Sequence, residues 1–300
     1  WSCGGSALTD WRFWVDRGGT FTDLVGLAPD GRLLVRKVLS EQPGRAGDPA
    51  VAAMADLLAS EGSAGLASIA ELRLGTTVAT NALLEGAGDG VLLLTNTGLA
   101  DLLRIGDQHR PDLFALQLLP PPFLAAAVEE VTGRVDADGG EVTPLQLDQG
   151  LEERLRQHQR QGLRSCAIAL LHAWRYPEHE RQLEAFVRGL GFTTVVSSHR
   201  VCPLPRLVPR GQTTLVEAAV ARPLFAYLDQ VRGALGGHAR LRVMTSSGAL
   251  QPPASLQAKD TILSGPAGGM VGAVAVARRA GFKQEPLVGF DMGGTSTDVY

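Results

Sequence analysis

The stretch Asp16-Arg17-Gly18-Gly19-Thr20-Phe21-Thr22-Asp23 recurs near the other end of the chain as Asp291-Met292-Gly293-Gly294-Thr295-Ser296-Thr297-Asp298. The copies differ only at their second and sixth positions. They lie too far apart for a tandem array, whose period is roughly 20 to 50 residues. Apolar residues flank both copies, so each copy is predicted to be a β-hairpin with a tight glycine turn.

Each predicted turn is rich in donors for phosphate oxygens. Two adjacent glycines have no Cβ, so their backbone can take positive φ angles and their N–H groups can approach a ligand closely. Threonine hydroxyls beside the turn add to a nest of donors that suits phosphate. Two such hairpins facing each other would clamp one nucleotide, and the residues predicted to contact it are Gly18, Gly19, Thr20, Thr22, Gly293, Gly294, Thr295 and Thr297.

The aspartates that lead the two copies, Asp16 and Asp291, are predicted to be catalytic. Together with Asp298 they are the candidate ligands of a divalent cation, because Mg²⁺ prefers a few carboxylates in combination with nucleotide phosphates. An aspartate before a glycine turn can also serve as an Asx-type cap. The duplication favours catalysis for Asp16 and Asp291, whereas for Asp23 and Asp298 capping is nearly as good an interpretation.

The composition indicates a soluble globular protein with room for two domains. Of its 300 residues 45% are hydrophobic, and the net charge of −3 gives no electrostatic footprint for nucleic acid or an anionic membrane. No apolar run reaches the roughly 18 residues of a membrane span, and the N-terminus lacks the regions of a signal peptide, so we expect a cytoplasmic location. The cysteines Cys3, Cys166 and Cys202 are too few and too scattered for a disulfide framework or a zinc ribbon.

Strands dominate the start of the chain. Three are predicted at 11–15, 21–28 and 33–39, with a turn at Pro29-Asp30-Gly31. A helix is predicted after Asp48-Pro49. Further strands at 71–74 and 91–94 enclose a Gly-Thr-Thr loop and another helix.

The middle of the chain begins with an irregular segment at 108–122, which contains Pro120-Pro121-Pro122 and is predicted to be a domain boundary. Helices and strands then alternate, which implies a mainly parallel sheet. Their predicted ranges are 148–161, 166–173, 178–190 and 193–197. A long helix at 213–235 is predicted to kink or break at Pro223.

Two loops that follow predicted strands are candidates for contacting the substrate or the γ-phosphate, because open α/β sheets bind ligands at strand ends. Their candidate residues are Gly75, Thr76, Thr77, Asn81, Ser246 and Gly248. An ordinary strand-to-helix turn with threonine as the N-cap is an equally good interpretation. Gly265, Gly268 and Gly269 precede an apolar helix and either line the nucleotide or let that helix pack closely.

Six motifs resemble the hydantoinase A and 5-oxoprolinase family, and they occur in the family's order along nearly the whole chain. They are DRGGTFTD (16–23), GTTVATNALLE (75–85), RPDLF (110–114), PEHE (177–180), LSGPAGG (263–269) and FDMGGTSTDV (290–299). Within the family, Arg17, the stretch 37–41 and the string VPRG at 208–211 are similar to ATP-dependent 5-oxoprolinases. Ala249 stands where the family usually has glycine.

The resemblance implies an α/β fold of actin-like, ribonuclease-H-like ATPase halves with mixed sheets, of which the second is truncated. Residues 1–200 would be the amino-terminal hydantoinase/oxoprolinase region and 201–300 the start of the hydantoinase A region. The chain opens on Trp1 and stops just after the second hairpin turn, so we expect a fragment that is inactive alone.

The resemblance also implies ATP-dependent opening of 5-oxo-L-proline to L-glutamate, with ATP and Mg²⁺ as cofactors. The expected partners are a small cyclic amide and either a second copy of the chain or a hydantoinase B-type region. Two alternatives stay open. One is a subunit of an ATP-dependent hydantoinase or ketone carboxylase, and the other is an actin-like nucleotide switch that does not hydrolyse a lactam.

Overall fold

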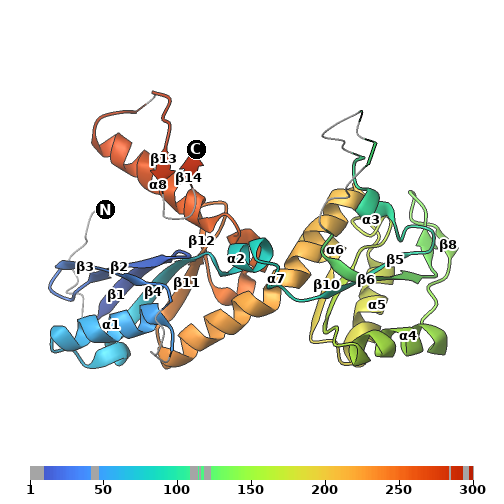
Figure 1. Cartoon of the computed structure of the whole chain (residues 1–300), viewed down its shortest axis with the longest axis horizontal. Helices are drawn as coiled ribbons and strands as arrows, with labels where there is room; N and C mark the ends of the chain where they lie inside the picture. Colours follow the sequence, from blue (N-terminus) through green and yellow to red (C-terminus); the bar gives the residue numbers. More distant parts are fainter. Residues whose placement is uncertain are drawn as a thin grey trace. The chain divides into compact units, whose positions relative to one another are not determined.

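The computed structural model describes residues 10–41, 47–108, 114, 116–117, 123–283, 285–292 and 297–299. The chain forms two compact units (Figure 1). Unit 1 combines Trp1–Leu84 with Pro223–Tyr300, and unit 2 is Glu85–Arg222. The domain boundary predicted at 108–122 is therefore wrong, and the proline triplet at its end lies outside the described residues.

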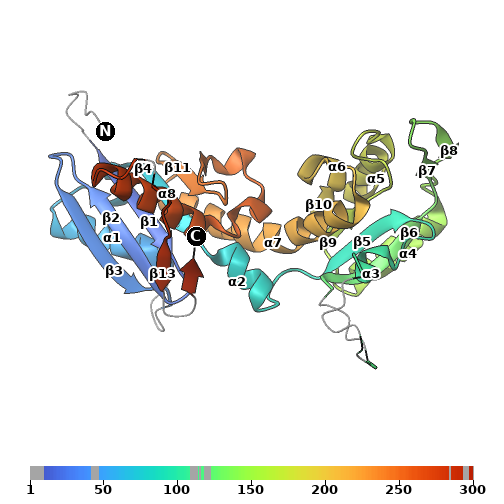
Figure 2. The same ribbon diagram turned by 90° about the horizontal axis from the view of Figure 1, so that it is seen from above.

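Unit 1 is built on a mixed six-stranded sheet with the order β12-β11-β4-β1-β2-β3. The first three strands form an antiparallel meander, β4 and β11 run parallel to β1, and β12 is antiparallel to β11. This confirms the predicted meander and the mixed sheet of a ribonuclease-H-like half (Figure 2). The strands are β1 (Trp11–Arg17), β2 (Phe21–Leu27), β3 (Leu33–Leu39), β4 (Ile69–Thr76), β11 (Arg240–Met244) and β12 (Leu250–Gln251).

One face of this sheet is buried because alternate strand residues are large and apolar. Phe13, Leu24 and Leu72 are almost completely buried, and α1 (Pro49–Ser60) packs on β2 and β3. The Asp48 carboxylate begins α1 by accepting the N–H groups of Ala50 and Val51. Figure 1 shows α1 on one side of the sheet and α8 (Ser264–Arg279), which contacts β4 and β11, on the other.

The long helix α7 (Leu207–Ala234) begins earlier than predicted and runs without a break through Pro223. Proline in a helix lacks one backbone hydrogen bond and crowds the preceding turn. The division between the two units falls at this residue. Of the two predicted outcomes at Pro223, the continuous helix excludes a break, and a kink stays a prediction.

Unit 2 contains a four-stranded sheet with the order β10-β9-β5-β6, in which all neighbours are parallel. The predicted parallel sheet is confirmed. Its elements are β5 (Val91–Asn96), α3 (Leu102–Ile105), β6 (Ala125–Val131), β7 (Arg134–Val135), β8 (Glu141–Thr143), α4 (Gln149–Arg160), β9 (Ser165–Ile168), α5 (Glu178–Gly189), β10 (Thr194–Ser197) and α6 (Ser198–Val201). Strand β9 is shorter than predicted, because it ends at Ile168 and the chain then forms a turn at 171–175 that contains His172, whose φ is 59°.

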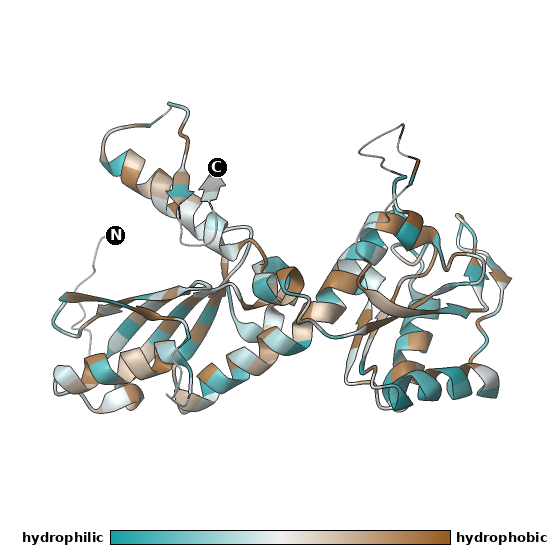
Figure 3. Cartoon of the chain, in the orientation of Figure 1, coloured by the Kyte–Doolittle hydropathy of each residue, from teal (hydrophilic) through white to brown (hydrophobic). Residues whose placement is uncertain are grey.

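The helices of unit 2 are amphipathic, and their apolar side chains close the core. Helix α4 is mostly hydrophilic in Figure 3, but its Leu151 and Leu155 are buried. They pack in one cluster with Leu92 and Ile168 of the strands. Cys166 also belongs to this core, and burial raises the pKa of its thiol far above the ordinary value, so it is an inert thiol.

The two ends of unit 2 are joined by an ion pair, which we call the clasp. The guanidinium of Arg222 donates from Nε to both carboxylate oxygens of Asp89, at 2.7 and 2.8 Å. Asp89 also accepts the hydroxyl of Ser165 at 2.8 Å, and its backbone N–H donates to Ala219. Burial by itself would raise the pKa of the Asp89 carboxyl, but the contacts with Arg222 and with the Ser165 hydroxyl outweigh burial and lower this pKa.

The remaining elements belong to unit 1. They are η1 (Gly65–Ser68), α2 (Val78–Leu84), η2 (Pro253–Ser255), η3 (Ala258–Thr261), β13 (Phe290–Met292) and β14 (Thr297–Val299). Strands β13 and β14 are antiparallel, which confirms the second predicted hairpin. Among the helices in the described part of the chain, none combines the length and the hydrophobicity that a bilayer span requires.

Candidate functional site

The first hairpin has a two-residue turn. Gly18 N–H donates to the carbonyl of Phe21 at 3.0 Å, so Gly19 and Thr20 form the loop between β1 and β2. Neither Gly18 nor Gly19 uses the positive φ angles that are open to glycine. Glycine fits position 18 for another reason, since an added Cβ would lie 3.0 Å from the Phe21 carbonyl oxygen.

The hydroxyl of Thr22 supports the turn from inside the fold. Its Oγ1 lies 2.9 Å from Oγ of Ser40, which donates to the carbonyl of Gly18 at 2.7 Å. Ser40 N–H also donates to Thr20. Thr22 is completely buried, so the prediction that it contacts phosphate is corrected. Thr20 is exposed beside the turn and stays a candidate.

Four residues lie side by side on one face of the sheet. Asp16 is opposite Asp23 of β2 and opposite Gly75 of β4, and Asp23 is opposite Lys37 of β3. Directly opposed residues share a face. We call Lys37, Asp23, Asp16 and Gly75 the carboxylate row. Lys37 Nζ donates to both carboxylate oxygens of Asp23, at 2.9 and 2.8 Å.

The carboxylate of Asp16 occupies a crowded and negative environment. Asp16 is exposed as a residue, yet its neighbours displace much of the water around the carboxylate. This desolvation raises the pKa of Asp16, the negative charges of Asp23 and Asp291 raise it further, and Lys37 lowers it. The structure therefore brings Asp16 and Asp291 near enough for their charges to interact.

Gly75 makes room for that carboxylate. A Cβ at this position would lie 2.9 Å from Oδ1 of Asp16. Thr76 is buried and its Oγ1 accepts the N–H of Val78, the first residue of α2, so its hydroxyl supports the turn that leads into this helix. The hydroxyl of Thr76 is therefore used within the protein, whereas the predicted contact of Gly75 with a substrate stays a prediction.

Thr77 and Asn81 connect α2 to the first hairpin. Thr77 donates its N–H and its hydroxyl to the carbonyl of Arg17, at 3.0 and 3.2 Å. Nδ2 of Asn81 lies 3.4 Å from the Thr77 hydroxyl and 3.7 Å from where a Cβ on Gly19 would be. Asn81, which lies in α2, is thus placed beside the glycine turn.

The loop at Ser246 is held against a neighbouring segment. Ser246 donates its hydroxyl to the carbonyl of Asp260 at 2.8 Å and accepts the N–H of Leu263 at 3.0 Å. Gly248 has a φ of 77°, whereas Ala249 has no positive φ. The substitution of alanine for the family's glycine at 249 is therefore free of backbone strain. Although the Ser246 hydroxyl donates and accepts within the protein, Ser246 is exposed, and its predicted contact with the substrate or the γ-phosphate stays a prediction.

Gly265, Gly268 and Gly269 lie in the first turns of α8. A Cβ on Gly265 would have no neighbour within 4 Å, and one on Gly268 would meet only Met244, at 3.9 Å. Close helix packing therefore does not explain glycine at 265 or 268. Their predicted position along a nucleotide stays a prediction.

The second hairpin repeats the register of the first. Asp291 is opposite Asp298, as Asp16 is opposite Asp23. Gly293, Gly294 and Thr295 lie outside the described residues, and Thr297 is exposed on β14. The two leading aspartates thus occupy equivalent positions on equivalent hairpins.

Within the described ranges, no group of three acidic, histidine or cysteine residues is placed to hold a metal ion. Mg²⁺ is usually held by one or two carboxylates with water and phosphate. Asp16 and Asp291 offer two such carboxylates, and their mutual repulsion is what a cation would relieve. The donor set therefore fits a magnesium ion.

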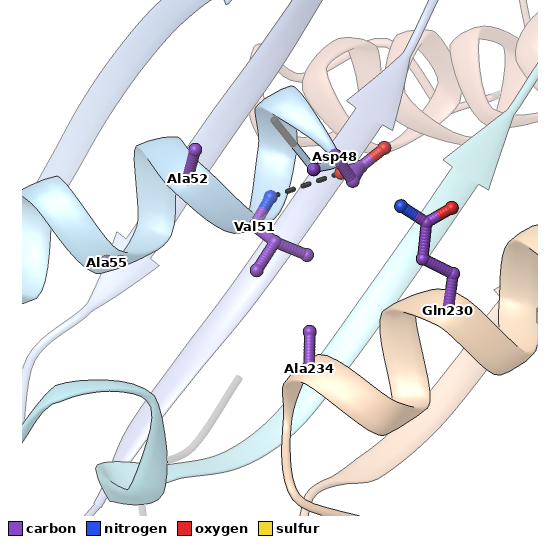
Figure 4. Close-up of a pocket in the computed structure, with 7 residues that line it drawn as sticks. Asp48, Val51, Ala52, Ala55, Gln230 and Ala234 are labelled. Carbon is purple, nitrogen blue, oxygen red and sulfur yellow. Dashed lines mark hydrogen bonds between the residues drawn. The ribbon is translucent and has the colours of Figure 1, made fainter. Parts of the chain in front are cut away.

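A pocket between α1 and α7 contains none of the predicted site residues (Figure 4). Asp48 and Gln230 are its polar side chains, while Val51, Ala52 and Ala234 make it largely apolar. The Asp48 carboxylate is already used to cap α1. This pocket is separate from the carboxylate row.

Two family models match successive parts of the chain. The model described as the hydantoinase/oxoprolinase N-terminal region matches residues 12–191, and the hydantoinase/oxoprolinase model matches 210–300. The chain belongs to the hydantoinase/oxoprolinase family. The compact units of this family member do not follow the division between the two matches, because unit 2 is inserted between β4 and β11.

Other family members share both sequence and fold with this chain. It is 36% identical to 5-oxoprolinase 1 of Arabidopsis thaliana over 96% of its own length and 25% of that protein. The crystal structure of the ATP-dependent caprolactamase from Pseudomonas jessenii matches with a TM-score of 0.80 and 29% identity. The nucleotide-free structure of acetone carboxylase matches with a TM-score of 0.79 and 26% identity. Each match covers 96% of this chain and 43% of the solved chain.

Proposed function

We propose that this chain is part of an ATP-dependent hydrolase that opens the lactam ring of 5-oxo-L-proline to give L-glutamate. The observation that carries the proposal is the equivalent placement of Asp16 and Asp291, the leading acids of two hairpins that share one register. Similarity to 5-oxoprolinase 1 supports the lactam as substrate. The chain spans a quarter of that relative, so the remaining length would supply the rest of the enzyme.

The role of ATP is to activate a stable amide. Transfer of the γ-phosphoryl group to the lactam oxygen releases ADP and makes that oxygen a leaving group. Water then adds to the carbon that carries the phosphorylated oxygen, and cleavage of the ring C–N bond frees the amino group and leaves an acyl phosphate. A second water displaces phosphate from this acyl phosphate and gives glutamate. Phosphoryl transfer depends mainly on positioning and charge neutralisation.

The hairpins would supply that positioning. Backbone N–H groups and hydroxyls at 18–20 and 293–295 would hold the phosphates, and Asn81 beside the first turn would contact the γ-phosphate or the substrate. Asp16 and Asp291 would hold Mg²⁺, directly or through water, and the bound ion would offset the charge of the phosphates. The carboxylate of Asp16 keeps its position because Gly75 leaves space for it.

A second candidate is a subunit of an ATP-dependent hydantoinase, lactamase or ketone carboxylase. The similarity to the caprolactamase and acetone carboxylase structures favours it. Relatives named caprolactamase subunit alpha and acetophenone carboxylase gamma subunit also support action within a complex, either with a hydantoinase B-type region or with further copies.

Release of ADP by the full-length protein decides between these functions. We expect stimulation by 5-oxoproline and none by hydantoin, caprolactam or acetophenone. Stimulation by one of the other compounds would replace the substrate, and ATP binding without stimulation by any of them would support a nucleotide switch. The variant Asp16→Asn should lose ATP turnover while it keeps its fold, and turnover within about threefold of wild type would contradict the proposed role of this residue.

A further inference from the structure

Lys37 stands at one end of the carboxylate row. The predicted site residues do not include it. Its ammonium group contacts both oxygens of Asp23, and it lies over the ring of Phe21, 5.4 Å from the ring centroid. Phe21 follows the glycine turn directly. The side chain of Lys37 is thus oriented along the same sheet face towards Asp23 and the first hairpin, although more than half of it is exposed.

The charges on this face create a problem for binding an anion. Asp16 and Asp23 are opposed across two strands, and like charges in that arrangement repel each other. Asp291 adds a third negative charge near Asp16. A nucleotide with its anionic phosphate tail would have to approach the same place, and Lys37 is the cation that joins the row.

We propose that Lys37 is a positioning residue of the nucleotide site. It holds the Asp23 carboxylate at the side of the row away from Gly75 and offsets the negative charge of that carboxylate. An anionic phosphate tail can then approach the first hairpin. This inference rests on the proposed function, because it needs the hairpin to bind a nucleotide. Lys37 acts through Asp23 and is not itself a catalytic residue.

A simple surface ion pair is the competing explanation. Such exposed pairs contribute on the order of 0 to 1 kcal/mol to stability, so variants of Lys37 fold, and thermal stability does not distinguish the two explanations. Nucleotide affinity does, because a surface pair without a role in the site leaves it unchanged.

The experiment measures binding of Mg·ATP to the full-length protein by calorimetry, with thermal unfolding as a check of folding. The variant Lys37→Met should weaken binding by about tenfold, which is the effect of losing one favourable unit charge near a surface site. Lys37→Arg keeps the charge and should bind within about threefold of wild type. Arg36→Met is the matched control, because this adjacent cation lies on the opposite face of β3 and donates to the backbone of Val35.

A double variant isolates the action through Asp23. If Lys37 offsets that charge, then Lys37→Met should weaken binding much less when Asp23→Asn is already present, so the two effects are not additive. Equal loss in both backgrounds, or unchanged binding by Lys37→Met, would overturn the inference while the proposed function stands. Failure of the wild-type protein to bind Mg·ATP would overturn both.

Discussion

Replacing Gly75 by alanine tests whether the carboxylate row positions Asp16. The added Cβ would lie 2.9 Å from Oδ1 of Asp16, whereas carbon and oxygen atoms in ordinary contact are about 3.5 Å apart. The carboxylate must therefore move by about half an ångström. A misplacement of about 1 Å can reduce a catalytic rate by about 10²-fold. We accordingly expect ATP turnover to fall by about tenfold.

The fold should tolerate this change, because Gly75 lies in a strand without a positive φ and alanine restricts the unfolded chain more than glycine does. The assay is ADP release with 5-oxoproline, together with thermal unfolding. Gly233→Ala on α7 is the matched control, since a Cβ there would meet nothing within 4 Å. Turnover of Gly75→Ala within about twofold of wild type, in a protein that Asp16→Asn inactivates, would refute the spacing argument.

Three further changes test the support of the site and of the fold. Ser40→Ala removes the buried hydroxyl between Thr22 and Gly18 and should lower the free energy of unfolding in urea by about 1 to 3 kcal/mol; no change would show that the network is dispensable. Gly211→Ala places a Cβ 2.6 Å from Leu103 and should cost about 1 to 3 kcal/mol in the same measurement, whereas a neutral result would mean that the helix shifts freely. The folded-state pKa of Asp16 lies above its ordinary 3.8, so stability falls as pH rises from 3.8 through the folded-state pKa, and ionised Asp16 is unfavourable at pH 7. Asp16→Asn should therefore raise the unfolding temperature at pH 7. A lower unfolding temperature would contradict the sign of the pKa shift.

Local patterns were sufficient to predict the hairpins and the meander. Each depends on alternation and on turn residues within a few positions, and these preferences agree with the final sheet. The same alternation could have corrected Thr22, because it must face away from Asp23 in a strand. A meander turn centred on Asp30 also places residue 23 opposite residue 37, so the contact between Lys37 and Asp23 could have been predicted from the sequence.

Other features depend on contacts that are remote in sequence. Insertion of unit 2 follows from the pairing of β4 with β11, which no local pattern reveals. The reason for glycine at 75 appears only when β1 lies beside β4. Proline at 223 is a strong local signal, but tertiary packing overrides it and the helix continues.

The clasp between Asp89 and Arg222 has a consequence for the order in which the chain folds during synthesis. β4 ends at Thr76 and its partner β11 begins at Arg240. At the usual rate of protein synthesis, β11 is made on the order of ten seconds after β4, and one edge of β4 is unpaired during that time. Unit 2 emerges as one continuous segment in that interval. Once it folds, the clasp holds Asp89, near its start, against Arg222, its last residue. The long loop that separates the two strands then becomes effectively short. The entropy lost in joining β11 to β4 then falls, because the cost of closure increases with loop length.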